Sequence, residues 1–277
     1  MLEIILDKTV IDDFGSFSMQ GRILEKILLN DNNLFIISKK LLIYIEEKLS
    51  GAILERWENL FLYLHDNNKL KSIQNYDTLN VDEIYASIGN TDNYVFVLKN
   101  ISSPINDNEY TCYLKDSSLN NNFLIKILQT NQVTFRSSDF NSNAQIDNFF
   151  TKMITCSKTN KEVIIIARYN NFSCTLIEKV KAKFIKKEYW TTLKNNNCST
   201  NNVALMKMKL GSTLKVFTGT NKDIHERKII IGNMLLEFDD DFDKIKSSLH
   251  TWTGSCIINE DVVTKLIKKR KNLNPLN

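Results

Sequence analysis

Two acidic residues lie at predicted ends of secondary-structure elements: one follows a strand, and the other begins a helix that leads to a second strand of the same small sheet. Asp7 ends the short run Glu3–Leu6, which is apolar from residue 4 onward, and the hydroxyl of Thr9 follows two positions later. Such a run predicts a buried parallel strand that delivers Asp7 to the carboxyl edge of a sheet, where open α/β folds build their sites. Asp82 heads a predicted helix that leads to the apolar run 94–98. Because Mg²⁺ and Mn²⁺ prefer hard oxygen ligands, these carboxylates indicate a divalent-metal site.

The charged residues divide unevenly along the chain. Residues 1–110 hold 10 Lys and Arg against 17 Asp and Glu, a net charge of −7, whereas residues 111–277 hold 26 against 15, a net charge of +11. This division fits a metal-binding domain joined to a domain that holds an anionic partner. Solvated lysines in a Lys-rich protein explain the same excess without any partner. The phosphate-contacting residues that we expect in the basic part are Arg136, Arg168, Arg227 and the row Lys265–Lys271.

The elements that must position these residues alternate between strand and helix over the first hundred positions. Predicted strands cover residues 3–7, 34–37, 69–73 and 94–98. Predicted helices cover residues 19–29, 39–49 and 52–64, and a fourth begins at Asp82. Ser38 has the side chain and the position to cap the second helix. Alternation of this kind predicts a parallel sheet with helices on both faces.

A polar stretch, residues 101–122, separates this part from a second α/β unit. Pro104 and a cluster of Asn residues break both periodicities there, apart from one weak strand at 110–114. Beyond it, strands are predicted at 133–136, 163–166, 184–190 and 214–217, with a hairpin at 228–238 that turns at Gly232-Asn233. Helices are predicted at 144–155, 174–183, 202–209 and 261–271. We therefore expect an α/β protein with a parallel-sheet domain, 1–105, and a mixed-sheet domain, 123–277.

The order and spacing of the first features resemble a PIN-type nuclease domain. Asp7 with Thr9 comes first, then a strand–Ser–helix block at 35–42, and then the helix headed by Asp82, which leads to a strand and Asn100. In that family, three or four acids bind a divalent metal and activate water to cut RNA. Asp7 and Asp82 match the family pattern, and Asn100 stands in place of the fourth acid.

The second-helix acid of that pattern is displaced in this chain. Its expected slot falls near Tyr44, and the nearby acids are Glu46 and Glu47, of which Glu47 lies one turn along the same face. The resemblance therefore implies that Asp7, Glu47 (or Glu46) and Asp82 bind Mg²⁺ or Mn²⁺. It also implies that Thr9 orients an acid or a water molecule.

Three segments of the basic part carry a second resemblance. They are Phe135–Phe140, Ile224–Ile230 and Leu236–Phe242. Together they resemble half of a phospholipase-D-like fold, in particular the variant found as a C-terminal module beside MIT domains. Catalytic members use His-x-Lys, whereas this chain has a single His225-x-Arg227. The resemblance implies a phosphate-binding role for His225, Arg227 and Arg136, and the alternative is a nucleophilic His225 with Arg227 as a bidentate phosphate clamp.

Other patterns narrow the class of protein. The run Asp239–Asp241 is typical of a solvated capping cluster more often than of a metal site, and three well-separated His residues indicate no imidazole metal site. The five Cys are scattered without a C-x-x-C pair, which predicts reduced thiols rather than zinc or disulfides. No signal peptide or membrane span is predicted, so we expect a cytoplasmic protein that does not bind membranes.

These observations lead to two functional hypotheses. The first is a metal-dependent endonuclease, acting on RNA more than on DNA, as a prokaryotic defence or toxin-type effector. The alternative is a catalytically inactive nucleic-acid- or phosphate-binding protein that serves in assembly or sensing, with a protein partner or as a homo-oligomer. Cleavage that requires a metal ion and Asp7 would separate the first hypothesis from the second.

Overall fold

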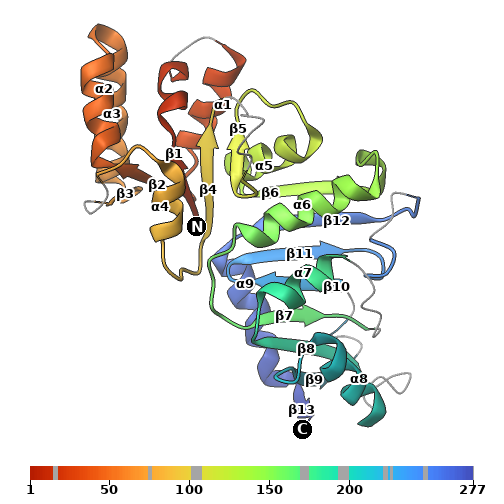
Figure 1. The fold of residues 1–277 in the computed structure, drawn as a ribbon. Coiled ribbons are helices and arrows are strands. Elements are labelled where there is room, and N and C mark those ends of the chain that lie inside the picture. The colour runs from red at the N-terminus through yellow and green to blue at the C-terminus, as the bar shows by residue number, and fades with distance from the viewer. Residues whose placement is uncertain are drawn as a thin grey trace. The chain divides into compact units, whose positions relative to one another are not determined.

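The structure, a computed structural model, describes residues 1–14, 18–73, 77–100, 108–168, 175–192, 200–220, 224, 227–245 and 249–276. The chain forms two compact units, residues 1–131 and 132–277 (Figure 1). The division therefore lies after the stretch 101–122 in which we expected the linker. The reason is that residues 111–130 form a strand and a helix of the first unit.

The first unit is built on a five-stranded, fully parallel sheet with the order β3-β2-β1-β4-β5. Its strands are β1 (Leu2–Leu6), β2 (Asn33–Ser38), β3 (Leu70–Ile73), β4 (Tyr94–Lys99) and β5 (Thr111–Tyr113). Its helices are the 3₁₀ helix η1 (Lys8–Asp13) and α1 (Met19–Leu28), α2 (Lys39–Lys48), α3 (Gly51–Asp66), α4 (Val81–Ser87) and α5 (Leu119–Thr130). All five residues of β1 are buried, as expected for a central strand of a parallel sheet. The predicted parallel sheet is confirmed.

Local sequence explains where the helices of this unit begin. The hydroxyl of Ser38 accepts a hydrogen bond from the backbone N–H of Leu41 at 3.2 Å, so it caps α2 as predicted.

Helix α4 covers one face of the sheet, where its apolar side chains pack against Ile5 of β1, Ile36 of β2 and Val97 of β4. These three strand residues lie side by side in the register of the sheet. The face covered by α4 therefore follows from the period-2 alternation of the strands.

Helix α5 lies where the sequence indicated irregular chain. Its Asn residues are not breakers, because Asn121 is buried and its side chain satisfies backbone groups of the preceding turn. The amide of Asn121 accepts from Tyr113 N–H at 2.8 Å and donates to the carbonyl of Asp116 at 2.8 Å. The Asn cluster thus ties α5 to β5 rather than ending a domain.

The second unit is built on an eight-stranded mixed sheet with the order β13-β9-β8-β7-β10-β11-β12-β6. Its strands are β6 (Gln132–Arg136), β7 (Val163–Ile166), β8 (Lys187–Thr192), β9 (Lys215–Gly219), β10 (Arg227–Ile231), β11 (Met234–Phe238), β12 (Thr253–Ile258) and β13 (Asn274–Leu276). Strands β7, β8 and β9 are parallel, and the other neighbouring pairs are antiparallel. The predicted mixed sheet is confirmed, and β10 and β11 form the hairpin expected at Gly232-Asn233.

Helices lie on both faces of this sheet (Figure 1). They are the 3₁₀ helix η2 (Ser137–Asp139), α6 (Asn143–Thr155), α7 (Thr175–Lys183), α8 (Thr200–Leu210), α9 (Glu260–Ile267) and the 3₁₀ helix η4 (Lys268–Asn272). The basic helix predicted at 261–271 therefore changes to 3₁₀ geometry after Ile267. None of the helices in the described parts of the chain combines the length and apolar composition needed to cross a membrane.

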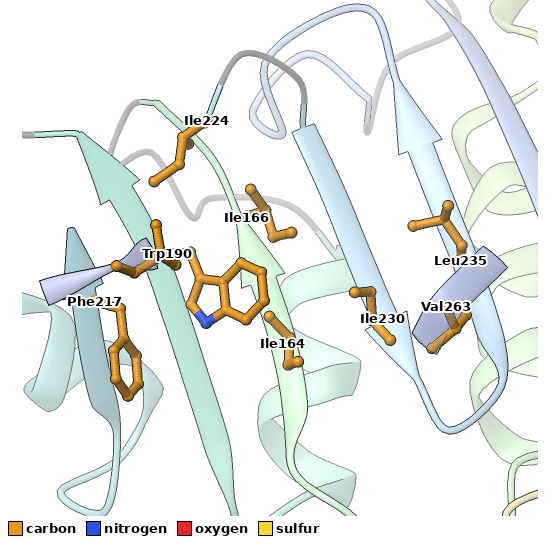
Figure 2. Packing of buried hydrophobic residues seen from close by; sticks show 9 residues of the cluster. Ile164, Ile166, Trp190, Phe217, Ile224, Ile230, Leu235 and Val263 are labelled. Carbon is orange, nitrogen blue, oxygen red and sulfur yellow. The ribbon is translucent and has the colours of Figure 1, made fainter. Parts of the chain in front are cut away.

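Each face of the second sheet has its own core. On one face, the ring of Phe135 makes edge contacts with Phe149 of α6, at 5.1 Å between centroids, and with Trp252, at 6.2 Å. On the other face, Trp190 of β8 lies beside Phe217 of β9 and Ile164 of β7, and Val263 brings α9 onto this cluster (Figure 2). The thiols of Cys112, Cys156 and Cys256 are buried and form no disulfide with one another, and the other two Cys lie outside the described residues.

Candidate functional site

The carboxyl end of β1 places Asp7 at the edge of the first sheet, where the sequence predicted it. The backbone N–H of Asp7 donates to the carbonyl of Leu98 in β4 at 3.0 Å, which continues the pairing of the two strands. The side-chain Oδ1 of Asp7 accepts from the N–H of Thr9 at 2.8 Å and so caps η1. Asp7 is only 8% exposed. The carboxylate is therefore held in place by the turn that follows its own strand.

Thr9 and Asn100 join Asp7 at this edge. The hydroxyl of Thr9 accepts a hydrogen bond from the backbone N–H of Asn100 at 3.1 Å, and Asn100 directly follows β4. Asn100 is 8% exposed, and its Oδ1 atom is buried without a hydrogen-bond donor among the described residues. A buried amide oxygen in this state is uncommon in folded proteins. Asp7 and Asn100 at this edge both carry side-chain oxygens of the kind that divalent cations bind.

The other two predicted metal ligands do not complete this group. Oδ1 of Asp82 accepts from Nδ2 of Asn108 at 2.8 Å and from the hydroxyl of Tyr110 at 3.0 Å. Glu47 is exposed near the end of α2, as is Glu46. Among the described His, Cys, Asp and Glu side chains, no group of three or more could hold a metal ion. The set Asp7, Glu47 and Asp82 thus does not fit a three-carboxylate centre, because Asp82 binds the segment before β5 and Glu47 faces solvent.

Arginines of the second unit gather at one edge of its sheet. Arg136 ends β6 and lies opposite Thr253 at the start of β12, while Arg227 starts β10 opposite Phe238. Arg168 follows β7 by two residues, and β7 runs antiparallel to β10. The alternating strand directions therefore bring all three guanidinium-bearing residues to the same edge. His225 lies outside the described residues, so its expected role stays a prediction.

A pocket of about 540 Å³ opens beside Arg227. Its lining residues come from four neighbouring strands and the turn after β11: Thr134, Arg227, Glu237, Phe238, Asp239, Thr253, Gly254 and Ser255. The hydroxyl residues come from β6 and β12, and an ion pair joins Glu237 to Lys228 of β10 across the hairpin. Hydroxyl and guanidinium groups both donate hydrogen bonds to phosphate oxygens. The pocket lining thus combines these donor groups with the carboxylates of Glu237, which is paired with Lys228, and Asp239, which accepts from Thr253 N–H.

Each carboxylate of the acidic turn Asp239–Asp241 has a partner in the second unit. Asp239 accepts from the N–H of Thr253 at 2.7 Å, and Asp241 accepts from Arg227. Asp240 pairs with Lys244 at 3.0 Å. Burial alone would raise the pKa of Asp240. Hydrogen bonds from Asp241 N–H and from Lys244 nevertheless hold this pKa below its usual value. The three carboxylates of this turn therefore each have a hydrogen-bond or ion-pair partner within the second unit.

A second group of charges was not found from the sequence. Glu188 of β8 is 2% exposed, and its carboxylate accepts from Arg270 at 2.7 Å and from the indole N–H of Trp190 at 3.0 Å. Burial and a hydrogen bond to Glu162 raise the pKa of Glu188 to about 7, although Trp190 and Arg270 oppose this shift. The same hydrogen bond holds the pKa of Glu162 below its usual range, helped by Lys215. The sequence feature that could have indicated this group is the pair of charged residues 187–188, because they lie in a strand, β8, that is buried throughout.

No family model matches the sequence, and no curated protein sequence matches it. Among solved structures, the phospholipase D family member Nuc from Salmonella typhimurium is similar at 13% identity and a TM-score of 0.37, over 53% of this chain and 97% of Nuc. Polyphosphate kinase from Porphyromonas gingivalis is similar at 13% identity and a TM-score of 0.40, over 57% of this chain and 28% of the kinase. Phosphatidylserine synthase from Haemophilus influenzae is similar at 15% identity and a TM-score of 0.38, over 52% of this chain and 40% of the synthase.

Proposed function

We propose that the protein binds nucleic acid, RNA in preference to DNA, through the arginine-bearing edge of its second unit. The observation that carries this proposal is the position of Arg136, Arg168 and Arg227 at one edge of a single sheet, next to a pocket with hydroxyl donors. The second unit, residues 132–277, holds 24 Lys and Arg against 14 Asp and Glu, and this net charge of +10 supports the proposal because phosphate backbones attract basic surfaces over long distances.

Binding of single-stranded RNA is expected to weaken steeply with salt, since bound arginines release counterions from the phosphates. Each phosphate contact adds about −0.7 to the slope of log K against log salt for a single strand. Arg136→Gln is expected to lower the affinity and to reduce this slope by about that amount. Fluorescence anisotropy of labelled RNA at several salt concentrations measures both quantities.

The matched control is Arg22→Gln, the same substitution at an exposed position of α1 in the first unit. It is expected to leave both the affinity and the slope near their wild-type values. Equal losses in the two variants would show that general charge, rather than the edge of the second sheet, governs binding. A preference for DNA over RNA at equal salt would overturn the choice of substrate.

A second candidate function is metal-dependent cleavage of the bound strand by the first unit. One observation favours it: the carboxylate of Asp7 and the buried Oδ1 of Asn100 are at the same sheet edge, joined through Thr9. These oxygens would hold Mg²⁺ or Mn²⁺, and such an ion lowers the pKa of a bound water molecule. Asp82 and Glu47 are not part of this smaller set.

Asp7→Asn is expected to lower Mn²⁺-dependent RNA cleavage by at least about tenfold, the lower end of what losing a group that supports a metal costs. RNA binding by the second unit should stay unchanged, because Asp7 belongs to the first unit. Cleavage of a labelled RNA on denaturing gels, with anisotropy in parallel, tests both points. Full cleavage by the variant, or cleavage that resists chelators, would rule out this candidate.

A further inference from the structure

We propose that Asp241 is an internal competitor for the phosphate-bearing ligand at Arg227. This inference rests on the proposed nucleic-acid-binding function of that edge. In the structure, Nε and Nη2 of Arg227 approach the same oxygen, Oδ1 of Asp241, at 2.7 Å and 2.6 Å. The guanidinium fork is thus engaged by a carboxylate oxygen, which offers it the same kind of charged acceptor as a phosphate oxygen.

The environment of the pair makes this competition effective. The Arg227 side chain is 19% exposed and that of Asp241 is 27% exposed, so water screens their attraction only in part. Arg227 also lines the pocket of the second unit, so a ligand in that pocket lies beside the residue that carries the ion pair. A phosphate group that takes the fork of Arg227 must therefore displace Asp241.

The turn that carries Asp241 is fixed independently of Arg227. Phe242 follows Asp241, is 1% exposed and contacts the ring of Phe238 at 6.0 Å between centroids. Asp239 and Asp240 have partners of their own in Thr253 and Lys244. Release of Asp241 therefore requires its side chain to rotate while the backbone of the turn stays in place.

A purely structural ion pair makes the opposite prediction. If Asp241 only held Arg227 in position for the ligand, its loss would leave the guanidinium less well placed and would weaken binding. If Asp241 competes with the ligand, its loss strengthens binding and adds one phosphate contact. The sign of the change in affinity therefore distinguishes the two roles.

The test uses the full chain and fluorescein-labelled single-stranded oligouridylate at fixed salt. Asp241→Asn keeps the shape of the side chain and removes its charge, and it is expected to bind the RNA about 3- to 10-fold more tightly. The salt slope should steepen by about 0.7, because a phosphate no longer competes with the charged carboxylate of Asp241 for the guanidinium of Arg227. Adding Arg227→Gln to Asp241→Asn should abolish the gain.

The matched control is Asp243→Asn, which makes the same change in charge at a partly buried position two residues after Asp241. A similar gain in this control would mean that net charge alone is responsible, and would overturn the inference. Asp241→Ser, checked like the others by thermal unfolding, repeats the test if Asp241→Asn does not fold.

The outcomes separate this inference from the proposed function. If wild type binds RNA and Arg227→Gln weakens binding, but Asp241→Asn leaves it equal or weaker, the inference fails and the proposed function stands. If neither wild type nor Asp241→Asn binds RNA, the proposed function fails and the inference fails with it. Tighter binding that depends on Arg227 supports both.

Discussion

Replacing Gly254 with alanine is expected to lower the free energy of unfolding of the second unit by about 1–3 kcal/mol, the usual cost of overpacking a core. Gly254 lies in β12 between Phe135 of β6 and Phe238 of β11. A Cβ atom there would lie 2.3 Å from Cε2 of Phe135 and 3.0 Å from Cδ1 of Phe238. Both rings are buried in the aromatic cluster, so neither can move aside without disturbing its neighbours.

Gly89→Ala provides the control for this prediction. A Cβ atom at Gly89 meets nothing within 4 Å, so the substitution should change stability by less than about 0.5 kcal/mol. Urea unfolding followed by tryptophan fluorescence reports both units, since Trp57 is in the first and Trp190 and Trp252 are in the second. Equal unfolding midpoints for the two variants would contradict the close packing described around Gly254.

The contribution of Glu188 to stability is expected to fall as the pH rises from about 4.5 to about 7. Burial raises the pKa of Glu188 from 4.5 to about 7 in the folded protein. Between these two pKa values the Glu188 side chain keeps its proton in the folded state, whereas the unfolded chain has lost it. The stabilisation by Glu188 is therefore complete below pH 4.5 and is lost as the pH rises through about 7. For one group the slope cannot exceed about 1.4 kcal/mol per pH unit.

Glu188→Gln removes this dependence, because an amide stays uncharged at every pH and mimics the protonated carboxyl. The free energy of unfolding of the variant minus that of wild type should increase between pH 4.5 and 7. Above pH 7 this difference should stay constant. Chemical unfolding of both proteins across this range measures the difference. The matched control is Glu178→Gln, the same change at an exposed position of α7. A wild-type–variant difference that does not change with pH would refute the role assigned to Glu188.

Strands with continuous apolar runs were the most predictable part of the fold. The runs at 94–98 and 163–166 became β4 and β7. The turn at Gly232-Asn233 was predictable because Gly-Asn between two apolar runs is typical of a two-residue hairpin turn, and Gly232 there adopts a positive φ of 56°. Strand β12 was missed, since its sequence mixes small and polar residues around Gly254. Its pairing with β6, over a hundred residues earlier in the chain, supplies what the local sequence does not.

The candidate sites were predictable only where a strand end fixes the residue. Asp7 lies where its apolar run ends, so its position followed from β1 alone. Whether Glu47 faces the sheet depended on which face of α2 is buried. Leu41 and Ile45 lie on the buried face, and Glu47 is exposed. The pairing of Arg227 with Asp241 depends on the whole length of the β10–β11 hairpin and on the turn after it. Side-chain contacts of this kind are set by tertiary packing, which local pattern does not encode.

Strand β13 covers the hydrogen-bonding groups on the outer side of β9. It pairs with the outer side of β9, and Pro275 lies opposite Phe217. Proline carries no N–H group and therefore cannot donate to a further strand, which makes it suited to the edge of a sheet. A fragment that stops before Asn274 would leave the hydrogen-bonding groups of β9 open to strands of other molecules, and such edges promote aggregation. Residues 274–276 therefore protect β9 from pairing with strands of other molecules.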